Sequence, residues 1–157
     1  MIDNLNLIKE KTLAVTGHRK LTPDLDIYRL EEIFLSQIEN GVDTFLIGMA
    51  VGFDAICFQI LEKIRDSKDI KLIACIPCEN QSKLFTIDQK IEYERQLKSA
   101  NQKIFISKEY TPYCMMKRNT FMVDNASKLV CFLRENKGGT FNTVKYAEKQ
   151  NIEIIKV

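Results

Sequence analysis

The sequence predicts an α/β fold, a Rossmann-like three-layer sandwich with a mainly parallel sheet of five to six strands. Short apolar runs rich in β-branched residues alternate with longer segments of helical periodicity along all 157 residues. Most of these runs place apolar residues on both faces, which is typical of parallel strands covered by helices on both sides. Because no repeat, low-complexity tract or linker interrupts the alternation, we expect a single domain over residues 1–157.

The strands are predicted from the apolar runs. The run 70–77 is the clearest, since it is almost wholly apolar and ends at Pro77. The predicted strands span residues 11–15, 43–48, 70–77, 102–107, 128–134 and 152–157. We expect the strand order 3-2-1-4-5 with the last strand at an edge and right-handed crossovers.

The helices are predicted from apolar stripes and end signals. The first begins near Thr22, a candidate N-cap, with Pro23 in its first turn, and Gly41 closes it after residue 40. The next helix runs from the loop 49–54 to about residue 66. The remaining predicted helices span residues 85–100, 113–127 and 140–150.

Composition excludes several classes of protein. Hydrophobic residues make up 45% and charged residues 28%, as in ordinary globular domains, and no apolar run reaches transmembrane length. Without a signal peptide, the chain is expected in the cytoplasm. Five cysteines, an odd number, indicate reduced and mostly buried thiols, and the spacing of Cys75 and Cys78 is interpreted as incidental. We therefore expect no metal site and no cofactor.

The net charge of +2 is too small to indicate nucleic acid or an anionic membrane as a partner. The chain also lacks a basic stripe. Direct nucleic-acid binding and membrane binding are therefore expected to be absent.

The loop after the first strand reads Thr16-Gly17-His18-Arg19. A strand that breaks at glycine before a helix aims backbone N–H groups at a site that favours an anion. Arg19 adds a planar cation suited to phosphate or carboxylate. The alternative is that Gly17 only makes the turn while His18 and Arg19 face solvent.

Two other loops fall at the same predicted sheet edge. Gly48 and Gly52 allow a close backbone approach after the second strand, and Asp54 is either a ribose ligand or a helix cap. After the fifth strand, the run 137–143 (Lys-Gly-Gly-Thr-Phe-Asn-Thr) suits a phosphate cradle, although it could be a plain strand-to-helix turn. Because ligands in such sheets lie beyond the carboxyl ends of the strands, three such loops favour a shared ligand site.

The helix before the fifth strand carries polar residues within an apolar face. Arg118 and Asn119 interrupt a face formed by Met115, Met116 and neighbouring apolar residues. A buried arginine needs a partner. The partner is either an acid such as Asp124, or a ligand phosphate.

Together these motifs resemble the YpsA-like family of the SLOG superfamily, to which Lonely Guy phosphoribohydrolases and the DNA-processing protein DprA also belong. The matching motifs are Thr-Gly-His-Arg (16–19), Gly-Met-Ala-x-Gly-x-Asp (48–54), Arg-Asn-x-x-Met-Val-Asp (118–124) and Gly-Gly-Thr-x-x-Thr (138–143), in the family's order. The resemblance implies a Rossmann-like fold that binds or senses a nucleotide or nucleotide-derived ligand of ADP-ribose or NAD type. The ligand-binding positions it implies are Thr16, Gly17, His18, Arg19, Gly48, Met49, Gly52, Asp54, Arg118, Asn119, Asp124, Gly138, Gly139, Thr140 and Thr143.

One departure from the Lonely Guy motif bears on catalysis. Phe141 replaces its third glycine and Lys145 stands at the position of its glutamate. Because a lysine cannot stabilise a cationic sugar transition state, we assign no catalytic residue and expect binding without catalysis. The alternative is a nucleotide hydrolase or N-glycosidase that uses Asp54, Asp124 or a glutamate from another segment, with His18 as acid–base. By analogy with Lonely Guy relatives, we also expect a homodimer.

Overall fold

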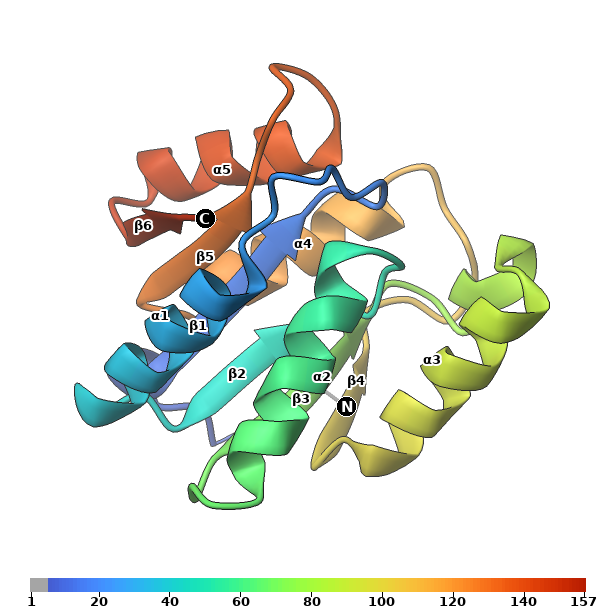
Figure 1. Ribbon diagram of the computed structural model, residues 1–157. Helices are drawn as coiled ribbons and strands as arrows, with labels where there is room; N and C mark the ends of the chain where they lie inside the picture. Colours follow the sequence, from blue (N-terminus) through green and yellow to red (C-terminus); the bar gives the residue numbers. More distant parts are fainter. Residues whose placement is uncertain (1–5) are drawn as a thin grey trace.

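The computed structural model describes residues 6–157 and forms a three-layer α/β sandwich, as predicted (Figure 1). The sheet has six strands, all parallel, in the order β4-β3-β2-β1-β5-β6. The strands are β1 (Thr12–Gly17), β2 (Thr44–Ile47), β3 (Lys71–Ile76), β4 (Gln102–Phe105), β5 (Lys128–Phe132) and β6 (Glu153–Lys156).

The helices cover both faces of the sheet (Figure 1). They are α1 (Ile27–Glu39), α2 (Phe53–Arg65), α3 (Ile87–Ser99), α4 (Cys114–Asp124) and α5 (Gly139–Lys149), with short 3₁₀ helices η2 (Lys9–Lys11) and η3 (Gln81–Leu84). Within residues 6–157, no helix is long and apolar enough to cross a membrane.

The predicted strand order is wrong at β4. This strand pairs with β3 at the sheet edge, with Cys75 opposite Ile104, instead of lying between β1 and β5. Only Ile104 of its four residues is buried, as suits an edge strand with one side open to solvent. The chain thus builds β1 to β4 in one direction and returns to add β5 and β6, so the strand order reverses between β1 and β5.

The start of α1 also differs from the prediction. Asp26 is the N-cap, and its carboxylate accepts a hydrogen bond from the Arg29 backbone N–H at 3.0 Å. Thr22 and Pro23 lie in the preceding turn, where the Thr22 hydroxyl bonds the Asp24 carboxylate instead. The helix therefore begins about one turn later than the proline signal indicated.

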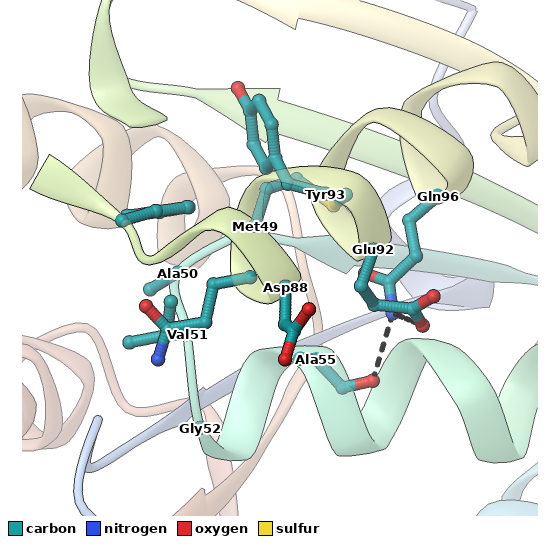
Figure 2. A pocket seen from close by; sticks show the side chains of 11 residues that line it. Met49, Ala50, Val51, Gly52, Ala55, Asp88, Glu92, Tyr93 and Gln96 are labelled. Carbon is teal, nitrogen blue, oxygen red and sulfur yellow. Dashed lines mark hydrogen bonds between the residues drawn. The ribbon is translucent and has the colours of Figure 1, made fainter. Parts of the chain in front are cut away.

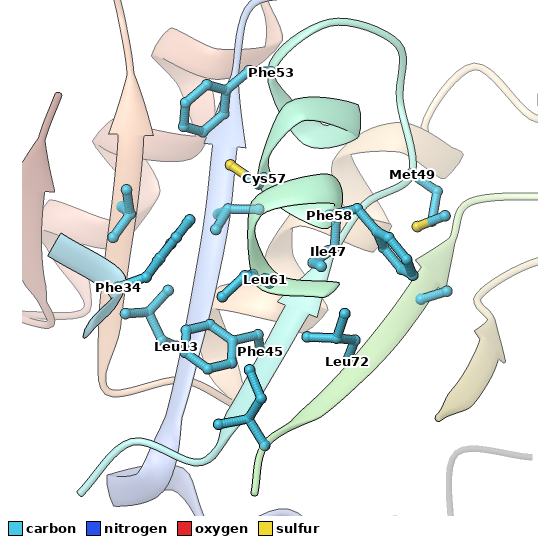
Figure 3. Close-up of a cluster of buried hydrophobic side chains, with 14 of the residues drawn as sticks. Leu13, Phe34, Phe45, Ile47, Met49, Phe53, Cys57, Phe58, Leu61 and Leu72 are labelled. Carbon is cyan, nitrogen blue, oxygen red and sulfur yellow. The ribbon is translucent and has the colours of Figure 1, made fainter. Parts of the chain in front are cut away.

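Successive residues of the central strands point into two separate cores. Leu13 and Val15 face the core beneath α1 and α2, whereas Ala14 faces the core beneath α4 and α5. Figure 3 shows the first core, where Phe34 of α1 and Phe58 of α2 pack over the sheet. All five cysteines are buried and unpaired in the described chain. This packing fixes the carboxyl ends of β1, β2 and β5 at one edge.

Candidate functional site

A cleft of about 360 Å³ lies at the point where the strand order reverses. Its walls come from the loop after β1, the start of α2, the first half of α4 and the loop after β5. This is the place where open parallel sheets bind ligands, and the volume is within the range of small-molecule sites. The lining residues are Val15, Thr16, Gly17, His18, Arg19, Ala50, Asp54, Met115, Arg118, Asn119, Glu135, Lys137, Gly138, Gly139 and Thr140.

Ten of the fifteen positions expected to bind ligand line this cleft: Thr16, Gly17, His18, Arg19, Asp54, Arg118, Asn119, Gly138, Gly139 and Thr140. Gly48 lies directly behind it, because its carbonyl oxygen accepts a hydrogen bond from Arg118. Met49 and Gly52 line a neighbouring cavity instead. The three glycine-bearing loops therefore meet at one edge of the sheet.

Two expected positions lie elsewhere. The Asp124 carboxylate accepts a hydrogen bond from the Tyr146 hydroxyl at 2.6 Å, where the last turn of α4 meets α5. Thr143 is buried on α5 and donates to the Gly139 carbonyl oxygen at 2.8 Å. Asp124 is therefore not the acid that faces Arg118; that acid is Asp54, whose carboxylate lies beside the Arg118 guanidinium.

Arg118 is the buried cation of the cleft, with 5% of its surface exposed. Its Nε donates to Asn119 Oδ1 at 2.7 Å, and Nη1 donates to the Gly48 carbonyl oxygen. The Met115 sulfur lies 4.0 Å from its Nη2 and 3.9 Å from the Nη2 of the exposed Arg19. Two guanidinium groups thus converge on one thioether, which concentrates positive charge on the cleft floor.

Asp54 is the buried carboxylate of the cleft. Its Oδ2 accepts a hydrogen bond from the Ala50 N–H at 3.1 Å, whereas Oδ1 is enclosed and has no partner among the described residues. Asp54 is therefore not the N-cap of α2, a position held by Gly52. Burial raises the pKa of the Asp54 carboxyl to about 6, opposed by Arg118, the Ala50 N–H and Arg19. The carboxyl can thus change its charge near neutral pH.

His18 has a structural contact within the loop. Its Nε2 accepts a hydrogen bond from the Arg134 backbone N–H at 2.7 Å, and its ring packs edge-on against Phe132. An Nε2 that accepts this bond places the proton of the neutral ring on Nδ1. His18 thereby ties the loop after β1 to the loop after β5, across the two strands that flank the cleft.

The loop after β5 leaves the start of α5 open. Gly138 is the N-cap with φ 94°, and as a glycine it has no side chain that could bond the N–H groups of the first turn. A Cβ added at Gly138 or Gly139 would meet nothing within 4 Å. Free N–H groups at the start of an eleven-residue helix are suited to an anion. Lys145 lies farther along α5, beside Glu148 at 3.4 Å.

Sequence reasoning missed several residues of this region. Lys137 was read as part of the glycine loop but not as a site residue, although it lines the cleft with Met115, Ala50 and Glu135. Gln81 of η3 was missed altogether. It is buried and donates to the Met49 carbonyl oxygen at 2.8 Å, which joins η3 to the loop after β2. Gln81 lies in a segment of the sequence without helical or strand periodicity and belongs to no motif, so the sequence did not indicate its role.

A smaller cavity of about 230 Å³ lies between α2 and α3 (Figure 2). Asp88 and Glu92 of α3 line it, and Gln96 donates to the Ala55 carbonyl oxygen of α2 at 3.2 Å. Ala50 lines both this cavity and the cleft. Its acidic lining makes it a poor site for an anion.

Comparison with known proteins decides the family. The model of the YpsA family, described as the YspA SLOG family, matches residues 13–156. The chain belongs to this family. An uncharacterized SPbeta prophage-derived protein, YoqJ of Bacillus subtilis strain 168, is 32% identical over 141 residues, which cover 77% of this chain and 81% of that protein.

The fold of this SLOG-family chain also occurs in DNA processing protein A (DprA). The Streptococcus pneumoniae structure matches with a TM-score of 0.70 and 13% identity over 94% of this chain. The Helicobacter pylori structure, described for its single-stranded DNA binding mode, matches with a TM-score of 0.66 and 16% identity over 94% of this chain. The chain spans 50% and 65% of those two proteins.

The DprA likeness corrects one prediction. From the net charge of +2 we predicted that the chain does not bind nucleic acid directly. That prediction is wrong, because a net charge of this size does not exclude nucleic-acid binding. The same fold belongs to a protein described for binding single-stranded DNA. Net charge averages over the whole surface, whereas binding depends on where the charges lie.

Proposed function

We propose that the cleft binds the phosphate end of a nucleotide or nucleotide-derived ligand of ADP-ribose or NAD type. The observation that carries the proposal is the convergence of Arg19 and Arg118 on Met115, in a cleft that the open start of α5 also lines. Arginine forks and free helix N–H groups both recognise phosphate.

The charges that line the cleft support an anionic ligand. Arg19, Arg118 and Lys137 contribute three positive charges, against the carboxyl groups of Asp54 and Glu135. Because burial raises the pKa of Asp54 to about 6, its negative charge is lost and the positive excess grows as the pH falls through about 6. Arg118 is already oriented by Gly48 and Asn119, so binding would cost little of its side-chain entropy.

Arg19→Ala gives the cleanest test, because the Arg19 side chain is exposed and, within residues 6–157, its polar contact is the Met115 sulfur. By isothermal titration calorimetry, this change should weaken ADP-ribose or NAD binding roughly tenfold or more, since a charge-assisted bond contributes about 1.5–3 kcal/mol. The matched control is Arg29→Ala on α1, an exposed arginine outside the cleft. Equal affinities of both variants and the parent protein would contradict the proposal. Chromatography of the incubated ligand separates binding from hydrolysis.

A second candidate ligand is single-stranded nucleic acid, favoured by the fold shared with H. pylori DprA. Its phosphates would use the same cations, Arg19 and Lys137, which lie exposed at the cleft. Fluorescence anisotropy with a labelled oligonucleotide tests it. Binding that weakens steeply with salt and with Arg19→Ala favours this candidate, whereas displacement of the oligonucleotide by ADP-ribose shows that the two ligands share the site.

A further inference from the structure

Building on the proposed function, we propose that the groove beside the cleft binds the base of the ligand and its second phosphate. The protein would then select a pyrophosphate-linked nucleotide over a simple sugar phosphate. The groove has a volume of about 580 Å³, and its lining includes Arg19, Gln81, Lys83, Phe85, Tyr110 and Met115.

The groove and the cleft are neighbours. Arg19 and Met115 line both. A ligand whose first phosphate lies at the start of α5 can therefore pass Arg19 and continue toward η3. Arg19 would then contact the pyrophosphate of the ligand.

The groove offers apolar surface to a planar group. Leu84 is 93% exposed and Tyr110 62% exposed, an unusual state for large apolar side chains beside a polar cleft. Phe85, which directly follows η3, also lines the groove and packs edge-on against Tyr93 with ring centroids 5.5 Å apart. Aromatic rings in such a place stack on a base with little dependence on its identity.

The charges of the groove separate it from the cavity of Figure 2. Lys83 and Arg19 line the groove, and no carboxylate of residues 6–157 does. The neighbouring cavity carries Asp88 and Glu92. A second phosphate is therefore attracted to the groove and repelled by the cavity.

Gln81 supplies an unused acceptor at the groove wall. Its Nε2 is held by the Met49 carbonyl oxygen at 2.8 Å and the Gly48 carbonyl oxygen at 3.4 Å. Its Oε1 has no partner among the described residues, although the residue is 8% exposed. A buried acceptor without a partner costs free energy, and an N–H donor of a base would satisfy it after a small shift of the side chain.

Calorimetry with two ligands and two tyrosine variants tests the assignment. The parent protein should bind ADP-ribose at least tenfold more tightly than ribose 5-phosphate. Tyr110→Ala should weaken ADP-ribose binding on the order of tenfold and leave ribose 5-phosphate binding unchanged. The matched control is Tyr28→Ala on α1, another exposed tyrosine, which should change neither affinity.

The outcomes separate this inference from the proposed function. If both ligands bind equally, or if Tyr110→Ala matches Tyr28→Ala, the groove assignment is wrong while the phosphate cleft stands. If neither ligand binds, the proposed function fails and the groove assignment fails with it.

Discussion

Arg118 donates a hydrogen bond from Nη1 to the carbonyl oxygen of Gly48, which holds the buried cation of α4 against the end of β2. A Cβ added at Gly48 would lie 2.8 Å from that Nη1 and 3.0 Å from Asp54 Oδ2. The absence of a side chain at Gly48 is thus what allows Arg118 and Asp54 to approach each other. The cleft depends on this glycine although the ligand need not contact it.

Gly48→Ala should therefore displace Arg118 and weaken the binding of ADP-ribose roughly tenfold or more, the loss expected for one charge-assisted bond. The free energy of unfolding should fall by about 1–3 kcal/mol, because the crowded groups are buried. Gly139→Ala is the control for stability, since its Cβ meets nothing within 4 Å. Calorimetry and thermal unfolding measure the two effects, and an unchanged affinity would show that Arg118 does not contact the ligand.

Asp54→Asn should change the pH dependence of stability. Because the folded-state pKa of Asp54 is raised to about 6 from 3.8, the folded protein holds a proton that the unfolded chain releases. The free energy of unfolding contributed by this group therefore falls as pH rises from about 4 to about 6. At pH 8 the variant should exceed the parent protein by on the order of 1–3 kcal/mol. Urea unfolding at pH 4 and pH 8 measures this, with Asp88→Asn as control; an equal effect at both pH values would contradict it.

Arg95→Ala should loosen α3 from α2. Arg95 bonds Glu62 of α2 at 2.9 Å and Glu92 of α3 at 2.6 Å. Its hydrogen bond, with smaller contributions from Gln59 and Gln96, lowers the pKa of Glu92 to about 2. This lowered pKa gives stability above about pH 4.5 that is lost as pH falls toward 2. Because the Arg95 side chain is 48% exposed, the loss at pH 7 should be only about 0.5–1 kcal/mol. Hydrogen exchange in α3 should accelerate, whereas Arg29→Ala should leave it unchanged.

Gly52→Ala should be far more damaging than Gly138→Ala. Both glycines have positive φ, 81° and 94°, so both variants carry the backbone strain of about 1 kcal/mol. At Gly52 the new Cβ would also lie 2.2 Å from the Arg19 carbonyl oxygen, whereas at Gly138 it meets nothing within 4 Å. Thermal unfolding compares them directly. Equal melting temperatures would mean that the loops after β1 and β2 are not packed as described.

The layers of the fold could be predicted because each strand is a short apolar run in the sequence, such as the run that forms the buried residues of β3. The strand that pairs with β4 could not be predicted, because pairing depends on contacts between segments that are far apart in the sequence. The polar residues Gln102 and Lys103, which the structure leaves exposed, are nevertheless typical of an edge strand. The cleft loops were found through glycines at the strand ends. Asp124 was wrongly placed in the cleft because it shares α4 with Arg118. The first half of α4 lines the cleft, whereas its last turn contacts Tyr146 of α5. Gln81 acts through backbone carbonyls of a distant loop, which no spacing reveals.

Backbone amide shifts during an ADP-ribose titration test the central claim most directly. If phosphate is held at the start of α5, the N–H signals of Gly139 and Thr140 should move most, together with those of the Thr16–Arg19 loop. Shifts that cluster at α1 or β6, or no shifts at millimolar ligand, would contradict a phosphate site between β1 and β5.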